Sequence, residues 1–231
     1  MSPKTVGLAV AILAAAGLVA LLKFGPSGGP AGDSRGLLLH LPLATDLEDH
    51  SRFKHPIKVV GKVQIEDAAA RFPGDGHLEA PHLSLEKKPF AVSMWLMAPV
   101  MMANQWLLDQ WHSDDVNHHL SLFLSGAIPA IAFEGNNARS RRKGLLGNDW
   151  NHLVFVFNGE QQQIWLNGEM VGNAAAQPYE GTEGATIIGR PHETTNTRLP
   201  FDGWMRDLRV YEGYFERSRI VALRAAGPQA R

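Results

Sequence analysis

The residues of this chain that could do chemistry gather in one short polar segment between two predicted strands. The segment supplies a tryptophan, two aspartates and histidines, and its candidate ligand-binding residues are Trp111, His112, Asp114, Asp115 and His118. An indole face and carboxylate acceptors suit a sugar, while histidine beside aspartate could hold a transition metal. Because binding residues concentrate in loops on a rigid scaffold, the segment is predicted to bind a ligand. A plain polar connection between two strands is the alternative.

A second candidate is a basic cluster further along the chain. Its candidate residues are Arg139, Arg141, Arg142 and Lys143, with Ser140 among them. Near an anionic membrane each basic group contributes about 1 kcal/mol of attraction. The cluster could therefore contact lipid phosphates or an acidic partner surface, or simply lie in a solvated loop.

Calcium is considered for one acidic loop, because several oxygen ligands that converge can bind this ion. Asp46 and Asp49 are the weak calcium candidates, with Glu48 between them. Solvated loop carboxylates are the favoured interpretation. No other metal site and no other cofactor is predicted.

Catalytic motifs are absent from the sequence. No glutamate is followed by aspartate two residues later, so the Glu-x-Asp-x-x-Glu pair of carboxylates that some glucanases use is missing. The sequence also lacks Gly-x-Ser-x-Gly, a glycine-rich phosphate loop and His-Glu-x-x-His. We therefore predict no catalytic residue and no enzyme, with glycoside hydrolysis as the least favoured function.

Composition excludes further classes. The formal net charge is -1, from 22 basic and 23 acidic residues, so no global field favours nucleic acid as a partner. The chain has no cysteine, which excludes disulfides, thiolate metal sites and cysteine nucleophiles.

The N-terminal segment is predicted to be a membrane anchor. Val6 to Leu22 carries no charge and lies between Lys4 and Lys23. At about 1.5 Å per residue a helix of this length reaches about 25 Å, the short limit for a bilayer span. The membrane-facing residues are Val6, Leu8, Ile12, Leu13, Leu18, Leu21 and Leu22. A cleaved signal peptide is the alternative.

The predicted boundaries follow from this segment. Residues 1–23 form the anchor, 24–36 a Gly/Pro linker, 37–226 the folded domain and 227–231 a tail. A short N-terminus ahead of the whole domain favours a single-pass protein whose domain lies on the extracytoplasmic side, periplasmic or extracellular.

The elements that must position these candidates are predicted to be antiparallel strands. Two Asn-Gly pairs, at 158–159 and 167–168, separate short apolar runs and indicate a meander of three strands. Other strands are predicted at Leu37–Leu43, Ile57–Ile65, Ala69–Phe72, His77–Ala80, Phe90–Ala98, Gln105–Trp111, His119–Ser125, Pro129–Phe133, Ala185–Gly189 and Trp204–Tyr211. Glu216–Arg224 is the one predicted helix of the domain. The pattern is that of an all-β two-sheet sandwich of jelly-roll type.

Several of these segments, in order, resemble the laminin-G-like, concanavalin A-like lectin/glucanase family. Ala70–Pro81 resembles its R-F-x-G strand and turn, Phe90–Leu96 its F-T-V-S-x-W strand, and Trp150–Leu153 with Trp165–Gly168 its W-x-H-V and Y-V-N-G strands. Phe201–Tyr211 resembles its final strand, in which Asp207 takes an acidic position expected to pair with basic or backbone neighbours. The resemblance covers about residues 37–224 and implies the jelly-roll fold rather than one function.

The combined prediction is a non-catalytic, membrane-anchored recognition module. The favoured function is an accessory subunit that docks on and stabilises a larger membrane assembly, with lipid and integral membrane proteins as partners. The alternative is a carbohydrate-binding, lectin-like surface module that uses the segment from Trp111 to His119.

Overall fold

A computed structural model describes residues 34–99, 103–111, 118–141 and 144–227. The predicted anchor and most of the linker lie outside these ranges, as do His112, Asp114, Asp115, Arg142 and Lys143. Within the described ranges, the single helix is too short and too polar to cross a bilayer.

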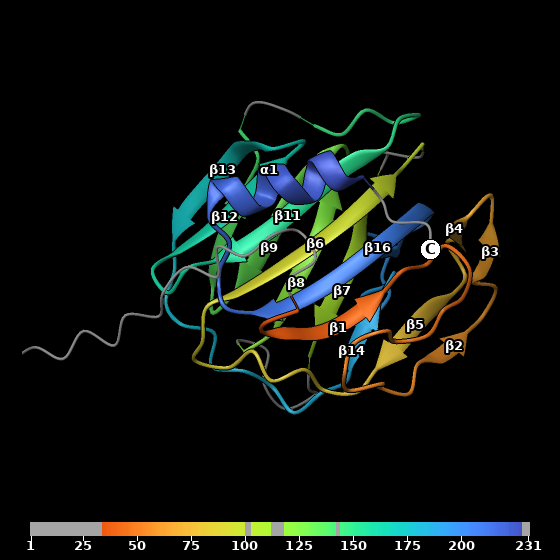
Figure 1. The fold of residues 1–231 in the computed structure, drawn as a ribbon, viewed down its shortest axis with the longest axis horizontal. Helices are drawn as coiled ribbons and strands as arrows, with labels where there is room; N and C mark the ends of the chain where they lie inside the picture. The colour runs from red at the N-terminus through yellow and green to blue at the C-terminus, as the bar shows by residue number, and fades with distance from the viewer. Residues whose placement is uncertain (1–33, 100–102, 112–117, 142–143, 228–231) are drawn as a thin grey trace, which may run out of the picture.

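Sixteen strands form two antiparallel sheets that pack face to face (Figure 1). Sheet A runs β13 (Glu169–Ala175), β12 (Gln161–Leu166), β11 (Asn151–Phe157), β6 (Phe90–Met97), β16 (Asp202–Glu212), β4 (Ala69–Pro73) and β3 (Gln64–Glu66), and β1 (Leu37–Leu41) also pairs with β16. Sheet B runs β10 (Asn136–Arg139), β9 (Ile128–Phe133), β8 (Leu120–Ser125), β7 (Asn104–Gln110), β14 (Thr186–Ile188), β5 (His77–Ala80) and β2 (Lys58–Val60). The short β15 (Leu199–Pro200) pairs parallel with β7. The predicted two-sheet sandwich is confirmed.

The core lies between the two sheets because alternate side chains of each strand point inward. Four inward rings contact one another at its centre: Phe90, Phe133, Phe157 and Tyr179. All four are buried among a shell of leucines, isoleucines and valines.

The predicted meander is confirmed as β11, β12 and β13, but its two turns differ. Asn167 and Gly168 have φ of 51° and 82°, as a two-residue type I′ turn requires. At the first turn only Gly159 has positive φ, and the Asn158 carboxamide oxygen accepts hydrogen bonds from the N–H groups of Glu160 and Gln161. Asparagine therefore acts there through its side chain.

The prediction of one strand over Ile57–Ile65 is wrong. Gly61, at φ 74°, ends β2 in sheet B, and β3 begins in sheet A. A Cβ on Gly61 would lie 2.2 Å from the Asp75 carbonyl oxygen, so the chain can turn there only with glycine. Strands β10 and β15 were not predicted, because the Asn-rich β10 has low β-propensity and β15 has two residues.

The helix α1 (Arg217–Ala226) covers the outer face of sheet A (Figure 1). Its Ile220 and Leu223 pack with Phe215 against outward side chains of β6, β11, β12 and β16, namely Ala91, Val154, Val156, Trp165 and Tyr211. The predicted helix is confirmed at almost the same residues. Within the part of the chain that the structure describes, no such helix lies over the outer face of sheet B.

Candidate functional site

Alternating side chains build the candidate site on the outer face of sheet B. On β8 and the residue before it, His119, Ser121 and Phe123 point outward, while the leucines between them point into the core. On β7, Trp106 lies opposite Phe123 and Asp109 lies opposite Ser121.

A β-bulge brings Trp106, on β7, and Trp111, directly after β7, to the same face of sheet B. Trp106 and Trp111 are five residues apart, so regular alternation would place them on opposite faces. The pairing of β7 with β8 shifts between Trp106 and Leu108, and the extra residue is the buried Leu107. The shift restores Trp111 to the face of Trp106, and both line the same cavity.

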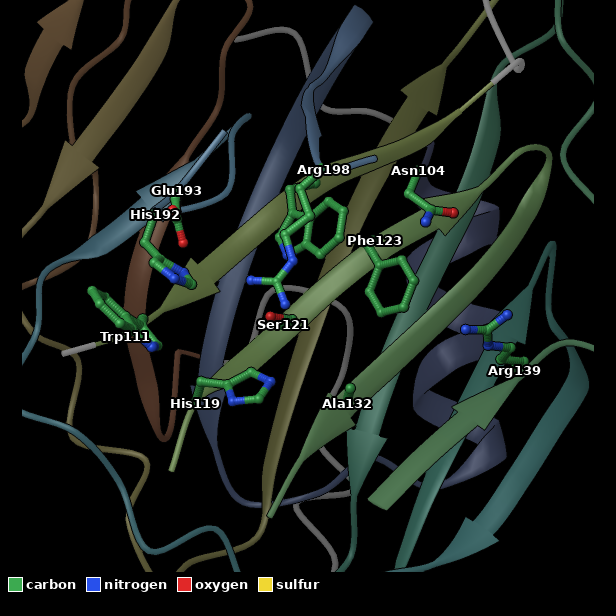
Figure 2. A pocket seen from close by; sticks show the side chains of 11 residues that line it. Asn104, Trp111, His119, Ser121, Phe123, Ala132, Arg139, His192, Glu193 and Arg198 are labelled. Carbon is green, nitrogen blue, oxygen red and sulfur yellow. The ribbon is translucent and has the colours of Figure 1, made fainter. Parts of the chain in front are cut away.

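An aromatic pair forms the floor of one part of this cavity. The rings of Trp106 and Phe123 stack with centroids 4.9 Å apart. The guanidinium of Arg198 lies 6.0 Å from the Trp106 ring centroid, and that of Arg139 lies 5.9 Å from the Phe123 centroid. Both distances are at the outer limit of a cation–π contact. Figure 2 shows Phe123 between the two arginines.

A buried carboxylate organises the other part of the cavity. Asp109 has no exposed surface, and its Oδ2 accepts hydrogen bonds from the His192 N–H at 2.9 Å and pairs with His192 Nδ1 at 2.7 Å. Its Oδ1 accepts a hydrogen bond from Ser121 Oγ at 2.5 Å. The imidazole of His192 stacks on Trp111 with ring centroids 3.7 Å apart. Asp109 thus holds the imidazole with Nδ1 turned inward, which leaves Nε2 as the ring nitrogen free of this contact.

The connection between β14 and β15 carries three of the lining residues, His192, Glu193 and Arg198. Its start is fixed by the Gly189 N–H, which donates to the Leu107 carbonyl. Its end is fixed by Thr195, whose hydroxyl accepts hydrogen bonds from the N–H groups of Thr197 and Arg198. These bonds place the connection beside β7 with Arg198 over the aromatic pair.

The cavity has a volume of about 430 Å³, in the range of small-ligand sites. It is lined by Asn104, Trp106, Trp111, His119, Ser121, Phe123, Ala132, Arg139, His192, Glu193 and Arg198 (Figure 2). Aromatic surface beside hydrogen-bonding groups is the chemistry that can hold a polar ligand with apolar faces, such as a sugar.

The structure brings together two of the predicted ligand residues, Trp111 and Arg139. Arg139 was predicted to lie in a loop, but it ends β10, opposite Ala130. His118 does not line the cavity, and its Nδ1 pairs with Glu134 Oε2 at 2.6 Å. Arg141 is exposed, and its backbone N–H donates to the Val171 carbonyl.

The two calcium candidates are engaged within their own loop. The buried Asp49 accepts hydrogen bonds from the N–H groups of His40, Ser51 and His55 and from Ser51 Oγ. Burial raises the pKa of this carboxyl, but these four donors outweigh burial and hold its pKa below the ordinary value. Asp46 pairs with His50 at 3.1 Å. No group of three or more metal-ligating side chains occurs within the described ranges.

The lining residues that sequence reasoning missed are Asn104, Trp106, Ser121, Phe123, His192, Glu193 and Arg198. One signal in the sequence could have found part of this set. His119, Ser121 and Phe123 alternate with leucines, which marks an outer face that is partly polar and aromatic. Nothing local marks residues 192–198 as partners of that face.

The outer face of sheet A carries polar groups of a different kind. Asp207 Oδ1 accepts a hydrogen bond from Arg209 Nε at 2.8 Å and pairs with His40 Nε2 at 2.9 Å, as expected for its structural position. Burial raises the pKa of Asp207, but His40 and Arg209 together hold it below the ordinary value. Burial lowers the pKa of His152, whose Nε2 lies 3.0 Å from Ser93 Oγ, to about 4.

A two-sheet β-sandwich of this topology, with a cavity on one outer face, defines a lectin-like jelly roll. The chain belongs to the concanavalin A-like lectin/glucanases superfamily, whose Laminin_G_3 sequence profile matches residues 72–221. The predicted family is thereby confirmed. A comparison with curated proteins gave no match.

Solved structures with the same fold include a domain of an arabinanase and binding domains of botulinum neurotoxins. Domain 4 of AbnA, a GH43 extracellular arabinanase from Geobacillus stearothermophilus in complex with arabinotriose, has a TM-score of 0.69 and 19% identity over 83% of this chain and 99% of that one. The binding domain of botulinum neurotoxin DC in complex with SialylT has a TM-score of 0.67 and 14% identity over 85% of this chain.

The same neurotoxin domain in complex with rat synaptotagmin II has a TM-score of 0.67 and 14% identity over 86% of this chain. The chain spans about half the length of both toxin structures, 52% and 53%. At these identities the likeness concerns the fold.

Proposed function

We propose that this domain is a carbohydrate-binding, lectin-like module whose binding site is the cavity on the outer face of sheet B. The observation that carries the proposal is the cavity itself, in which the half-buried Trp111 provides ring surface next to charged and hydroxyl groups, beside the buried aromatic pair of Trp106 and Phe123. Aromatic rings pack on the apolar faces of sugars, and the polar groups bond their hydroxyls. Solved structures of similar fold in complex with arabinotriose and SialylT add support.

We further propose that the site binds sugars and does not cleave them. Glycoside hydrolysis generally needs two carboxylates that flank the scissile bond. The described lining of the cavity offers one exposed carboxylate, Glu193, while both oxygens of Asp109 accept hydrogen bonds from Ser121 and His192. Ser121 donates to Asp109 and not to His192, so these three residues do not form a nucleophile-activating triad.

A glycan array probed with the purified full chain in mild detergent tests the binding function. Trp111→Ala removes an indole from the cavity, and we expect affinity for any glycan that binds to fall about tenfold. The matched control is Trp204→Ala, since Trp204 is also a half-buried tryptophan but lies on sheet A. Absence of glycan binding, or an equal loss in both variants, would contradict the proposal.

We also propose that residues 1–23 anchor the domain to a membrane and present it on the extracytoplasmic side. The support is the uncharged run from Val6 to Leu22 and the Gly/Pro linker behind it. Extraction of the native protein with mild detergent, followed by identification of its N-terminus, tests this. We expect Met1 in the membrane fraction, whereas a soluble protein that begins near Gly32 would show that the segment is removed.

The accessory-subunit function stays a prediction with less support than glycan binding. A neurotoxin binding domain, of which this chain covers 53%, is solved in complex with a protein, rat synaptotagmin II. Fixed-ratio co-purification with integral membrane proteins in the same detergent extract is the expected result if this chain is such a subunit.

A further inference from the structure

Among the described residues, the two arginines over the aromatic pair have no carboxylate partner. Neither Arg139 nor Arg198 forms an ion pair with any residue in the described ranges, and both side chains are exposed. An arginine over an aromatic ring on sheet A behaves differently. Arg71 lies over Trp204 and pairs with Asp202 Oδ1 at 2.7 Å. Arg71 is therefore neutralised, as Arg139 and Arg198 are not, although Arg206, 5.7 Å from the Trp150 ring centroid on sheet A, also forms no ion pair within the described ranges.

Apart from the two arginines, the cavity offers few free carboxylate oxygens as hydrogen-bond acceptors. Asp109 is the buried carboxylate beneath it, and its oxygens are already occupied by Ser121 and His192. Glu193 is the one exposed carboxylate of the lining. In Figure 2 it lies beside His192, on the far side of Arg198 from Arg139. The end of the cavity between the two guanidiniums is thus rich in N–H donors and carries positive charge.

We propose that the cavity selects acidic glycans, sugars that carry carboxylates or sulfates, and that Arg139 and Arg198, on either side of the aromatic pair, bind the anionic groups. This proposal rests on the glycan-binding function and names its ligand class. A guanidinium presents several N–H donors in a planar fork that matches the oxygens of carboxylate and sulfate. The rings of Trp106 and Phe123 beneath hold the two forks in place and exclude water from one side of the bound anion.

The aromatic pair also argues against a purely neutral ligand. Trp106 and Phe123 are only 8% and 6% exposed, because each stacks on the other and has a guanidinium over it. A sugar that relied on these rings alone would have to displace the arginines. A ligand that carries an anionic group can bond the guanidiniums where they are, and place its ring toward Trp111 and His192.

The experiment compares matched glycan pairs with the full chain in mild detergent. Polygalacturonate oligomers are measured against their carboxyl-reduced counterparts, and a sulfated polysaccharide against its desulfated form, which separates carboxylate from sulfate as the bound group. Polyglutamate of equal charge serves as an acidic polymer without sugar. Affinities are measured at two salt concentrations, since attraction between exposed charges weakens with ionic strength.

Three variants decide which residues act. We expect Arg198→Gln and Arg139→Gln each to weaken binding of the acidic glycan about tenfold and to weaken binding of the neutral glycan by a smaller factor. Arg217→Gln is the matched control, because Arg217 is an exposed arginine on α1, over the opposite sheet, and its removal changes the net charge equally. Thermal unfolding of each variant shows whether the fold is intact.

The outcomes separate this proposal from the function on which it rests. Preference for one acidic form, lost in the two cavity variants and kept in Arg217→Gln, supports both. Equal binding of acidic and neutral forms, or no effect of Arg139→Gln and Arg198→Gln, overturns the acidic-ligand proposal and leaves glycan binding standing. Equal binding of polyglutamate also overturns it, since the site would then attract any polyanion. No binding of any glycan overturns both.

Discussion

The two outer faces of the sandwich both carry arginines beside aromatic rings, but the surroundings of these residues differ. On sheet A, α1 packs over Val154, Val156 and Trp165, and Arg71 and Arg209 pair with Asp202 and Asp207. On sheet B no helix packs over the described strands, and Arg139 and Arg198 lie over rings without a carboxylate. A face whose charges are matched internally contributes to stability. A face with charged groups that have no internal partner is available to a ligand, because only a bound ligand can offset the cost of removing water from those groups.

The largest effect is expected from Asp207→Ala on sheet A. This substitution leaves the buried Arg209 guanidinium without its partner at 2.8 Å and frees His40 as well. Removal of one member of a buried ion pair costs about 3–5 kcal/mol. Chemical denaturation should show this loss of unfolding free energy, while the folded fraction keeps its affinity for glycan. A loss of glycan affinity in the folded fraction would mean that the two faces are coupled.

The next effect concerns pH and His152, also on sheet A. Its pKa is about 4 in the folded chain and about 6.5 when unfolded. Between pH 4 and pH 6.5 the unfolded state therefore binds more protons at His152 than the folded state does. The contribution of uncharged His152 to the free energy of unfolding is complete above pH 6.5 and is lost as the pH falls toward 4. A shift of this size corresponds to about 3 kcal/mol.

Unfolding free energies measured at pH 7, 5.5 and 4 test the His152 prediction. His152→Gln removes the titrating group and keeps a donor for Ser93, so the acid-dependent slope should become smaller in this variant. An unchanged slope would assign the acid sensitivity to other groups, Asp207 among them.

Asp109→Ala on sheet B is expected to cost less stability than Asp207→Ala and to affect binding more. The substitution removes the hydrogen bonds that Ser121 and His192 make to Asp109. It does not leave a charged side chain buried without a partner. The cost is about 1–3 kcal/mol. His192 loses its hydrogen bonds to β7, so glycan affinity should fall at least tenfold in titrations of the folded protein. Retained affinity would show that Asp109 does not position the site.

Ser121→Ala should give the smallest effect of the series. It removes one donor to Asp109 and keeps both contacts with His192. We expect a loss of about 1 kcal/mol in unfolding free energy and less than a threefold change in glycan affinity. A loss as large as that of Asp109→Ala would identify Ser121 as a direct ligand contact.

The sequence by itself determined the elements whose signals are local. Asn167-Gly168 dictates a tight turn, because positive φ at two successive positions favours these residues. Apolar runs of suitable length determined most strands of both sheets, and their order determined the family and the sandwich. Trp111 and Arg139 were also found from residue type alone, since they stand beside clusters of polar residues.

Only the tertiary structure decided which residues share the cavity. The bulge at Leu107 changes which face of sheet B Trp111 occupies. The sequence does not reveal this one-residue shift in register, because Leu107 lies between Trp106 and Leu108 in a continuous apolar run. His192 and Arg198 reach the site from 83 and 92 positions after Asp109 and Trp106 in the chain, through hydrogen bonds to β7 and contact with its rings. Local pattern carries no information on such long-range pairing, so the site exists only once the strands of sheet B are assembled.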